Sequence, residues 1–293
     1  MPRVETYFME HDGESYGTFF RATSVLHDSH SNYQRITVFE TAELGRVLKL
    51  NEVFNVSTLM EAYYHEPMAH IPVGLLGGAE RVMIVGGGDF ALAGHILKHS
   101  SVRKLTLCEI DDKVIRVCRK YFPQWAVVEK DPRFELIIAD GIEYLHSTVP
   151  ESYDLIIVDS TDAFDDSTAS VLTSVDFYSI ASSILRERGL LIQIAADTIF
   201  YCNFWRVLID NAQSFFQSFA PVFVPIPFYG TGSWGLLLLG KGGVLLDPQN
   251  ISDAYLDSIP GLRTMTRENI IGWFSLPPCV KAIVLGENQK DKR

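Results

Sequence analysis

Hydrophobic and polar positions follow two different patterns along the chain. Between about Tyr16 and Thr58, short runs rich in β-branched and aromatic residues alternate with turn signals, as in GTFFRATSVL, YQRITVFE and RVLKL. Such runs predict a small antiparallel sheet. From about Ile71 onward, continuous apolar runs alternate with helical patterns, so we expect repeated strand–helix units there.

Four apolar runs in this second part have the length of strands: ERVMIVG, KLTLCEI, FELIIAD and YDLIIVD. Because they are continuously apolar, each strand should be buried on both faces, as in a parallel sheet covered by helices. Helical patterns lie between the runs (ALAGHILKH, DDKVIRVCRKYF, GIEYLHSTV) and after them (VDFYSIASSILRERG). We therefore predict an α/β protein, with a small N-terminal antiparallel β domain over residues 1–70 and a Rossmann-like doubly wound sheet over residues 71–293.

One stretch, from Asn211 to Gly240, has no charged residue and is long enough to cross a bilayer. It is also dense in proline and glycine, which a membrane-spanning helix would not tolerate. We interpret it as the end of a helix, two buried strands and a turn. The N-terminus lacks the apolar region of a secretory signal, and the four cysteines show no CxxC spacing. Both features favour a soluble, cytoplasmic protein with reduced thiols.

The charge balance is acidic: 25 Lys and Arg against 36 Asp and Glu give a formal net charge of −11. Binding to nucleic acid or to an anionic membrane surface needs a basic surface, so neither is expected here. An acidic protein is suited to a cationic ligand, but acidity also serves solubility alone. The positions of the acids therefore matter more than their number.

The first two apolar runs end in residues suited to a nucleoside. ERVMIVG runs into Gly87-Gly88-Asp89, and Gly86, Gly88 and Ala91 fit the pattern G-x-G-x-x-A. Glycines at a strand-to-helix turn let a nucleotide-like ligand approach the backbone. Glu109, at the end of the second run, is suited to accept hydrogen bonds from ribose hydroxyls. Up to this point, NAD and S-adenosylmethionine-type ligands are equally compatible with the sequence.

The next two runs also end in acids. Asp140-Gly141 follows the third run, where a carboxylate can accept from the adenine amine, and Asp159-Ser160-Thr161-Asp162 follows the fourth. The carboxyl ends of parallel strands meet in one crevice, so these acids would line a strongly negative site. The pyrophosphate of NAD has no use for such a site. Each acid taken alone could instead cap the helix that follows it.

These motifs together resemble the polyamine aminopropyltransferases, best known as spermidine synthases. The similarity is carried by VMIVGGGD, LCEID, ADG and IIVDSTD, by the upstream segment SNYQRITVFETAELGRVLKLNEVFNVSTLMEAYYHEPMAHIPV, and by IPFYGTGSWG. It runs from about Tyr16 to about Gly240. It implies that the larger sheet is of the S-adenosylmethionine-dependent methyltransferase type.

The resemblance also implies site residues. Those for decarboxylated S-adenosylmethionine are Gln34, Gly86, Gly88, Asp89, Glu109, Asp140 and Gly141. Those for the polyamine are His65, Asp89, Asp159, Asp162 and Tyr229. Asp159 would be the general base, with Tyr64 and Tyr229 as further catalytic residues. The less favoured alternative is that His65 is an ordinary partly buried histidine and Tyr64 a core residue.

The implied reaction transfers the aminopropyl group of decarboxylated S-adenosylmethionine to putrescine, giving spermidine and methylthioadenosine. The amine must lose a proton before it attacks, because an ammonium has no lone pair. Asp89 would welcome the amine of the decarboxylated molecule and repel the carboxylate of ordinary S-adenosylmethionine. We expect no metal and no resident cofactor, and the resemblance implies a homo-oligomer, either dimer or tetramer.

Two departures from the family pattern keep alternatives open. The family continues GGGDGG, whereas Phe90 and Ala91 follow Asp89 here, and residues 163–168 lack the prolines of the family's loop. The alternatives within enzymes are an aminopropyltransferase with another amine acceptor and a polyamine N-methyltransferase. The alternative outside enzymes is a catalytically silent polyamine- or nucleoside-binding protein.

Overall fold

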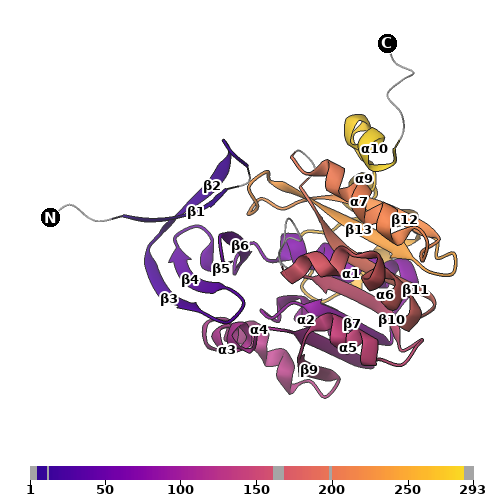
Figure 1. The fold of residues 1–293 in the computed structure, drawn as a ribbon, viewed down its shortest axis with the longest axis horizontal. Helices are drawn as coiled ribbons and strands as arrows, with labels where there is room; N and C mark the ends of the chain where they lie inside the picture. The colour runs from indigo at the N-terminus through magenta and orange to yellow at the C-terminus, as the bar shows by residue number, and fades with distance from the viewer. Residues whose placement is uncertain (1–4, 12, 161–167, 198–199, 287–293) are drawn as a thin grey trace, which may run out of the picture.

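The N-terminal region is built from short antiparallel strands, which confirms the predicted sheet. The computed structural model describes residues 5–11, 13–160, 168–197 and 200–286. β1 (Thr6–His11) pairs with β2 (Gly17–Ala22) as a hairpin. A second sheet has the order β3-β4-β5-β6, from strands Ser24–His30, Arg35–Thr41, Gly45–Leu50 and Val53–Ser57. Figure 1 shows these strands beside the larger α/β part.

The predicted run GTFFRATSVL is two strands rather than one. The backbone leaves the strand at Thr23, whose N–H donates to the carbonyl of Glu40 at 2.7 Å, and β3 then follows a new direction along β4. The hairpin strand β1 lies before Tyr16 and was not predicted. Its exposed and half-buried residues alternate without a fully buried position, so its apolar pattern is weak.

The larger sheet has the order β12-β13-β11-β10-β7-β8-β9. Its strands are β7 (Arg81–Gly86), β8 (Lys104–Glu109), β9 (Phe134–Ile138), β10 (Tyr153–Asp159), β11 (Leu185–Ala196), β12 (Ser218–Pro225) and β13 (Ser233–Gly240). The strands from β11 to β9 in this order run parallel, and β12 and β13 add an antiparallel edge. The doubly wound α/β prediction is confirmed.

Helices cover both faces of the larger sheet. They are α1 (Ala62–Leu76), α2 (Ala91–Ile96), α3 (Asp112–Tyr121), α4 (Pro123–Ala126), α5 (Gly141–Ser147), α6 (Val175–Ile184), α7 (Cys202–Ala212), α8 (Asp253–Asp257), α9 (Arg267–Trp273) and α10 (Pro278–Val284). Short 3₁₀ turns span Val127–Lys130, Thr168–Thr173 and Pro248–Asn250.

Alternate residues of the central strands enter two separate cores. In β7, Val82 and Ile84 pack with residues of α1, α2 and α3, whereas Met83 and Val85 pack with residues of α5, α6 and α7. Burial on both faces explains why these strands are continuously apolar in sequence. The edge strand β9 is the exception, since its residues are half-buried or exposed.

Two boundaries differ from the sequence analysis. The helix predicted over VDFYSIASSILRERG ends at Ile184, because Leu185 turns to extended backbone and pairs with Tyr153 as the start of β11. The predicted division between residues 70 and 71 falls inside α1, which joins the two parts of the chain, so that division stays a prediction. The interpretation of Asn211–Gly240 as a helix end, two buried strands and a turn is confirmed.

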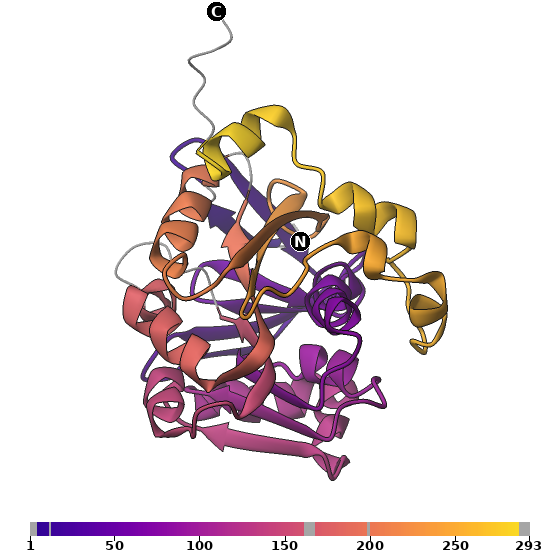
Figure 2. The same ribbon diagram turned by 90° about the vertical axis from the view of Figure 1, so that its right-hand side faces the viewer.

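The C-terminal segment lies beside α1. Tyr255 donates to the carbonyl of His70 at 2.6 Å, and the backbone N–H of Arg263 donates to Glu66 at 2.9 Å. Figure 2 shows this segment, in orange and yellow, along the outside of the molecule. Among the residues that the structure describes, none of the helices combines the length and the apolar character needed to span a bilayer.

Candidate active site

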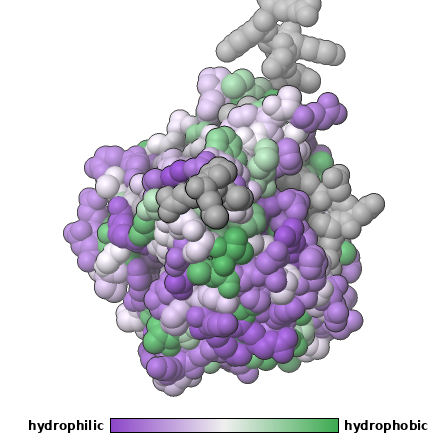
Figure 3. Space-filling model, turned by 90° about the vertical axis from the view of Figure 1, so that its left-hand side faces the viewer, coloured by the Kyte–Doolittle hydropathy of each residue, from purple (hydrophilic) through white to green (hydrophobic). Residues whose placement is uncertain are grey.

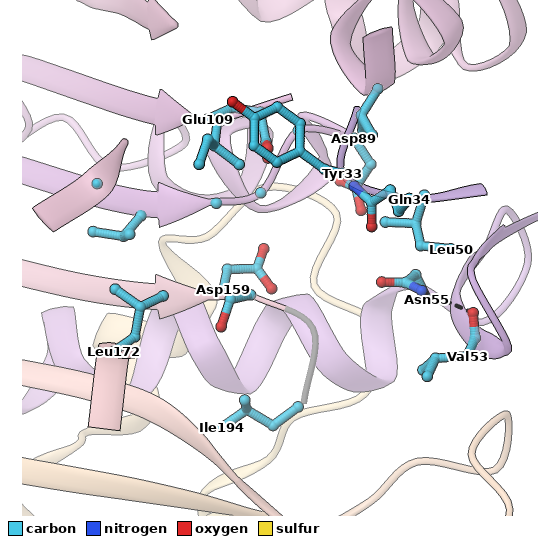
Figure 4. A pocket seen from close by; sticks show the side chains of 18 of the residues that line it. Tyr33, Gln34, Leu50, Val53, Asn55, Asp89, Glu109, Asp159, Leu172 and Ile194 are labelled. Carbon is cyan, nitrogen blue, oxygen red and sulfur yellow. Dashed lines mark hydrogen bonds between the residues drawn. The ribbon is translucent and has the colours of Figure 1, made fainter. Parts of the chain in front are cut away.

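The acidic strand ends meet in one cavity. β10, β7, β8 and β9 are neighbours in the sheet and run parallel, so their carboxyl ends share one edge. A cavity of about 360 Å³ opens there. Asp89, Glu109, Asp140 and Asp159 line it from the sheet side, as the sequence predicted. Figure 4 shows Gln34 and Asn55 on the side of the N-terminal strands.

The glycines of the first strand end allow the acids to come close. Gly86 has a φ of +87°, and a side chain there would collide with the carbonyl of Asp159, while the N–H of Gly87 donates to that carbonyl at 2.9 Å. A Cβ on Gly88 would lie 2.8 Å from Oε2 of Glu109. The glycine-rich turn thus packs directly against both neighbouring strand ends.

Phe90 occupies a position where the resembled family has glycine. Its φ of +72° lies in the left-handed region that favours glycine, yet its ring is fully buried. The ring packs 6.3 Å from that of Phe134 on the far side of the turn. Burial of this ring offsets the backbone strain, which is of the order of 1–3 kcal/mol. The departure from the family pattern therefore faces the core rather than the cavity.

At one end of the cavity, Glu109 is held by backbone donors. The N–H of Asp111 donates to Oε1 of Glu109 at 2.9 Å. Burial raises the pKa of Glu109 to about 7, although hydrogen bonds from the backbone of Asp111, Ile110 and Gly88 oppose the shift. The carboxylate is therefore fixed in place and ready to accept from a ligand once it is ionised.

Asp140 caps a helix and also lines the cavity. Its Oδ1 accepts from the N–H of Ile142 at 2.8 Å and of Glu143 at 3.3 Å, which is the capping role that any single strand-end acid could have. Gly141 follows as the first residue of α5, and a Cβ there would lie 2.7 Å from Cγ1 of Val85. The close packing of this helix start against β7 places Asp140 at the cavity.

Gln34 is held at the site by a hydrogen bond to Asp111, an acid that the sequence analysis did not single out. Asp111 is buried, and its Oδ2 accepts from the Nε2 of Gln34 at 3.1 Å and from the Oγ of Ser31 at 2.6 Å. Its Oδ1 caps α3 through the N–H of Lys113. Asp111 thereby fastens the turn between β3 and β4 to the end of β8. The signal in the sequence was its position two residues after Glu109 at a helix start.

At the other end, Asp159 forms a short hydrogen bond with a tyrosine of α1. The Oη of Tyr64 donates to Oδ1 of Asp159 at 2.6 Å, and the tyrosine is buried. Burial raises the pKa of Asp159, while the charge of His65 and the hydrogen bond from Tyr64 oppose the rise. Burial and the nearby carboxylate also raise the pKa of Tyr64, so its hydroxyl stays protonated as the donor. Tyr64 is both a core residue and a contact of Asp159.

Asp89 lines the same cavity as Asp159, and its carboxylate accepts few hydrogen bonds. Its Oδ1 accepts from the N–H of Ala91 at 2.7 Å, and its Oδ2 lies 3.9 Å from Nε2 of His65. Burial raises the pKa of Asp89 to about 6, the charge of His65 lowers it, and the charge of Asp159 raises it further. A cationic ligand placed between these carboxylates would favour the ionised form of both.

His65 is buried between two carboxylates rather than in an apolar core. Its Nδ1 lies 3.2 Å from Oε2 of Glu61, and its Nε2 faces Asp89. Burial lowers the pKa of His65, but the hydrogen bond to Glu61 and the charges of Asp89, Glu61 and Asp159 outweigh it and raise the pKa to about 9. The sequence analysis did not identify Glu61.

Tyr229 enters the cavity from the loop between β12 and β13. Its ring centroid lies 6.0 Å from that of Tyr64, and its Oη donates to the carbonyl of Asn55 at 3.2 Å. Asn55, on β6, lines the cavity as well and was not predicted from the sequence. Asp162, the remaining predicted site residue, lies outside the residues that the structure describes.

Comparisons with known proteins identify the same family across most of the chain. Residues 61–247 match the family described as "Spermine/spermidine synthase domain", and residues 6–57 match "Spermidine synthase tetramerisation domain". A polyamine aminopropyltransferase of Thermotoga petrophila is 31% identical over 94% of this chain and 92% of its own. Spermidine synthase 2 of Arabidopsis thaliana is 30% identical over 90% of this chain and 79% of its own.

Solved structures give the same result. The crystal structure of spermidine synthase from Thermotoga maritima superposes with a TM-score of 0.89 at 29% identity, covering 97% of this chain and 96% of that one. A spermidine synthase in complex with the transition-state analogue AdoDATO superposes with a TM-score of 0.91 at the same identity and coverage. Since the family model and the relatives cover both parts of the fold and the whole cavity, the chain belongs to the spermine/spermidine synthase family of polyamine aminopropyltransferases.

Proposed function

We propose that this protein transfers the aminopropyl group of decarboxylated S-adenosylmethionine to putrescine, producing spermidine and methylthioadenosine. The observation that carries the proposal is the pair Asp89 and Asp159, two carboxylates with raised pKa values facing one cavity beside Tyr64. Glu109 and Asp140 line the same cavity on neighbouring strand ends. One end thus suits ammonium groups and the other suits a nucleoside.

Asp159 serves as the general base in this proposal. The attacking amine arrives as an ammonium and passes one proton to Asp159. Its freed lone pair then forms a bond to the methylene carbon beside the sulfonium, and the C–S bond breaks with its electrons returning to sulfur. A raised pKa makes Asp159 a better proton acceptor than an ordinary aspartate. Positioning of the two substrates supplies much of the remaining rate enhancement.

Asp89 is the residue that selects the decarboxylated donor. It would accept from the aminopropyl ammonium, with Tyr229 supporting the incoming amine from the opposite wall. Intact S-adenosylmethionine carries a carboxylate at the corresponding position, which Asp89 repels. The residues that would hold the nucleoside are Gln34, Gly86, Gly88, Glu109, Asp140 and Gly141, and those for the polyamine are His65, Asp89, Asp159, Asp162 and Tyr229. No metal is needed in this scheme, because the sulfonium is already a good leaving group.

Product analysis with a panel of amines tests the proposal. The purified full-length chain is incubated with decarboxylated S-adenosylmethionine and putrescine, cadaverine or spermidine, and methylthioadenosine release is measured. We expect putrescine to have the highest kcat/KM, exceeding cadaverine by about 10-fold, since one methylene in an apolar site is worth that much. The same rate after dialysis against EDTA would support metal independence. A higher kcat/KM with another amine would overturn the acceptor assignment.

Two further outcomes would select the other candidate functions. Release of S-adenosylhomocysteine from ordinary S-adenosylmethionine would identify an N-methyltransferase. Thermal stabilisation by methylthioadenosine or polyamine with no product from any amine would identify a catalytically silent binding protein.

We also infer that the protein is a homo-oligomer, assembled through the N-terminal strands. The match of residues 6–57 to the tetramerisation domain supports this inference. Large apolar side chains of β1, β2 and β3 are exposed, among them Met9, Phe19 and Val25. Figure 3 looks onto this side of the molecule and shows hydrophobic residues gathered near its centre. Light scattering after size-exclusion chromatography distinguishes a tetramer from a dimer, and a monomeric mass would contradict the inference. A cytoplasmic location stays a prediction.

A further inference from the structure

A buried hydrogen-bonded chain of histidines lies between α1 and α2 and ends at Glu61, the residue before α1. It begins at His99, which follows α2, passes through His70 of α1 and His95 of α2, and ends at Glu61. The distances are 2.9 Å from His99 Nε2 to His70 Nδ1, 3.2 Å from His70 Nε2 to His95 Nδ1, and 3.0 Å from His95 Nε2 to Glu61 Oε2. All three imidazoles are buried.

The geometry fixes the tautomer of each imidazole in the chain. Glu61 can only accept, so Nε2 of His95 donates and its Nδ1 is left to accept from His70. Lys98, whose Nζ lies 3.3 Å from the same Nδ1, is also a donor and requires the same assignment. His70 then donates through Nε2 and accepts at Nδ1 from His99. Every N–H of the chain therefore points toward Glu61.

The three histidines of the chain are neutral. Burial is the main cause that lowers the pKa of His70 to about 2 and that of His99 to about 4, with the charge of Lys98 acting in the same direction, and burial also lowers the pKa of His95. Neutral imidazoles aligned in this way place the positive end of their dipoles at Glu61. Burial alone would raise the pKa of Glu61, but the hydrogen bonds from His65 and His95 lower it. The Nη2 of Arg263 also donates to Glu61.

Glu61 in turn acts on His65. A neutral imidazole carries a single N–H, yet both nitrogens of His65 face carboxylates, Glu61 on one side and Asp89 on the other. Nδ1 is within hydrogen-bond distance of Glu61, whereas Nε2, 3.9 Å from Oδ2 of Asp89, is too far for a hydrogen bond but close enough for a charge interaction. The imidazolium is therefore attracted by both carboxylates, which a neutral ring is not. Charges then alternate from the outside to the cavity, as Arg263⁺, Glu61⁻, His65⁺ and Asp89⁻.

We propose that Glu61, held as an anion by the His99–His70–His95 chain, is a positioning residue that keeps His65 protonated and thereby keeps Asp89 ionised in the free enzyme. Without the His65 cation, Asp89 and Asp159 would be two largely desolvated carboxylates of like charge beside one cavity, and one of them would take up a proton. The cationic donor substrate would bind an ionised Asp89 more tightly than a protonated one. This inference rests on the proposed function only in naming the ligand of Asp89. The charge states of Glu61, His65 and Asp89 are argued from the structure itself.

The groups that face His65 come from every element packed around it. They are Glu61, which precedes α1, Tyr64 of α1, Asp89 after β7, Asp159 of β10 and His95 of α2, with Lys98 and Arg263 acting on it through the chain or through Glu61. The acids among them outnumber the cations in direct contact with the imidazole. The balance of charge around His65 therefore favours its protonated form.

The first test is a titration of the ligand-free, full-length enzyme labelled with ¹³C and ¹⁵N in histidine. We expect the His65 signal, assigned by its loss in His65→Gln, to titrate near pH 9 with both nitrogens protonated below it. The signals of His70, His95 and His99 should stay neutral at pH 7. A His65 that is neutral at pH 7 would overturn the inference, and this measurement requires no variant at Glu61 and no turnover.

The second test removes the charge of Glu61 and keeps its size. In Glu61→Gln, the His65 midpoint should fall below about 7, because burial then dominates. The pKa of Asp89 should rise, so the acid limb of kcat/KM for decarboxylated S-adenosylmethionine should move to higher pH. We expect a loss of about 10-fold at pH 7 that is mostly recovered at pH 9. The same substitution in the His65→Gln background should shift the limb no further.

Glu66→Gln is the matched control. Glu66 lies on α1, five residues after Glu61, and is fully buried, but its carboxylate accepts from the backbone of Arg263 and Thr264 and from the Oγ1 of Thr264, away from the cavity. Its loss should lower the melting temperature and leave both the His65 titration and the acid limb in place. An unchanged limb in Glu61→Gln, or an equal shift in Glu66→Gln, would overturn the inference. Absence of turnover in the unmodified enzyme would instead refute the proposed function, and the titration would still decide the charge of His65.

Discussion

The two ends of the cavity use the same type of side chain in different surroundings. At the nucleoside end, backbone N–H groups hold Glu109 and Asp140 at the starts of the following loop and helix. At the amine end, Asp89 and Asp159 line the same cavity, and their hydrogen-bond donors are one backbone N–H and the hydroxyl of Tyr64, with Nε2 of His65 at 3.9 Å from Asp89. The first pair is fixed by the backbone and the second by side chains.

This difference shows how one row of strand-end acids can serve two purposes. Backbone hydrogen bonds fix the orientation of a carboxylate, which suits the recognition of ribose and adenine. A carboxylate with few donors in a buried site holds a proton more readily, which suits a base and a site for ammonium groups. The division should therefore appear in mutants as a loss of turnover at one end and a loss of nucleoside affinity at the other.

The largest effect is expected from Asp159→Asn. The amide cannot take the proton of the attacking amine, so turnover should fall by at least about 10³-fold. Methylthioadenosine is proposed to bind at the other end, so its affinity measured by calorimetry should stay within a few-fold. Asp154→Asn is the control on the same strand, since Asp154 lies at the opposite end of β10 and accepts from the backbone of Glu80 and Arg81. Comparable loss in both variants would remove Asp159 from its role.

Asp89→Asn should change which donor is bound. Loss of the carboxylate removes its attraction for the aminopropyl ammonium, so kcat/KM for decarboxylated S-adenosylmethionine should fall by about 100-fold, as for a buried charge pair that loses one partner. Binding of intact S-adenosylmethionine should become tighter, because its carboxylate is no longer repelled. Competition of both molecules against methylthioadenosine measures the ratio. An equal loss for both would mean that Asp89 does not discriminate between them.

Tyr64→Phe tests the side-chain support of the amine end. Removal of the 2.6 Å hydrogen bond should raise the pKa of Asp159 and reduce kcat by about 30-fold, the usual worth of a hydrogen bond to a charged group. The acid limb of kcat should move to higher pH, because Asp159 would stay protonated further up the pH scale. Tyr63→Phe is the neighbouring control, since Tyr63 packs against the core and does not line the cavity. A change of stability alone in Tyr64→Phe would contradict the assignment.

The acids of the cavity could be predicted from sequence because strand order places them. Asp89, Glu109, Asp140 and Asp159 each follow a continuous apolar run, and parallel strands bring their ends to one edge. The hydrogen-bond partners that distinguish these acids, and the pKa shifts that follow, could not be predicted in the same way. Whether a carboxylate is fixed by the backbone, as Glu109 is, or held by distant side chains depends on contacts between elements that are far apart in the chain.

The residues that were missed illustrate this limit. Glu61 precedes α1. This helix is buried on nearly all sides, so its faces differ little in hydrophobicity, and the apolar pattern predicted no helix there. Asn55 lies on a β-strand, where its polar side chain resembled an ordinary outward-facing position. Asp111 was noticed only as part of a motif, although it ties Gln34 to the site. Each of these residues acts through a partner at least 30 residues away or through a neighbouring helix.

The smallest effect concerns the pH dependence of nucleoside binding. Burial raises the pKa of Glu109 to about 7, so the carboxylate gains a proton as the pH falls through that value and can no longer accept from both ribose hydroxyls. The Kd for methylthioadenosine should therefore weaken by about 10-fold between pH 8 and pH 6. Methylthioadenosine carries no aminopropyl amine, so the titration of Asp89 should contribute little to this change.

Glu109→Gln should remove this dependence, giving weaker binding at pH 8 and a nearly constant Kd down to pH 6. Glu135→Gln, at the solvent-exposed start of β9 where Glu135 pairs with Lys104, should keep the normal pH profile. Isothermal titration at three pH values is enough to compare the variants. A pH dependence that survives in Glu109→Gln would place the titrating group elsewhere, and the nucleoside end would then differ from the amine end in geometry only, with no difference in how its carboxylates respond to pH.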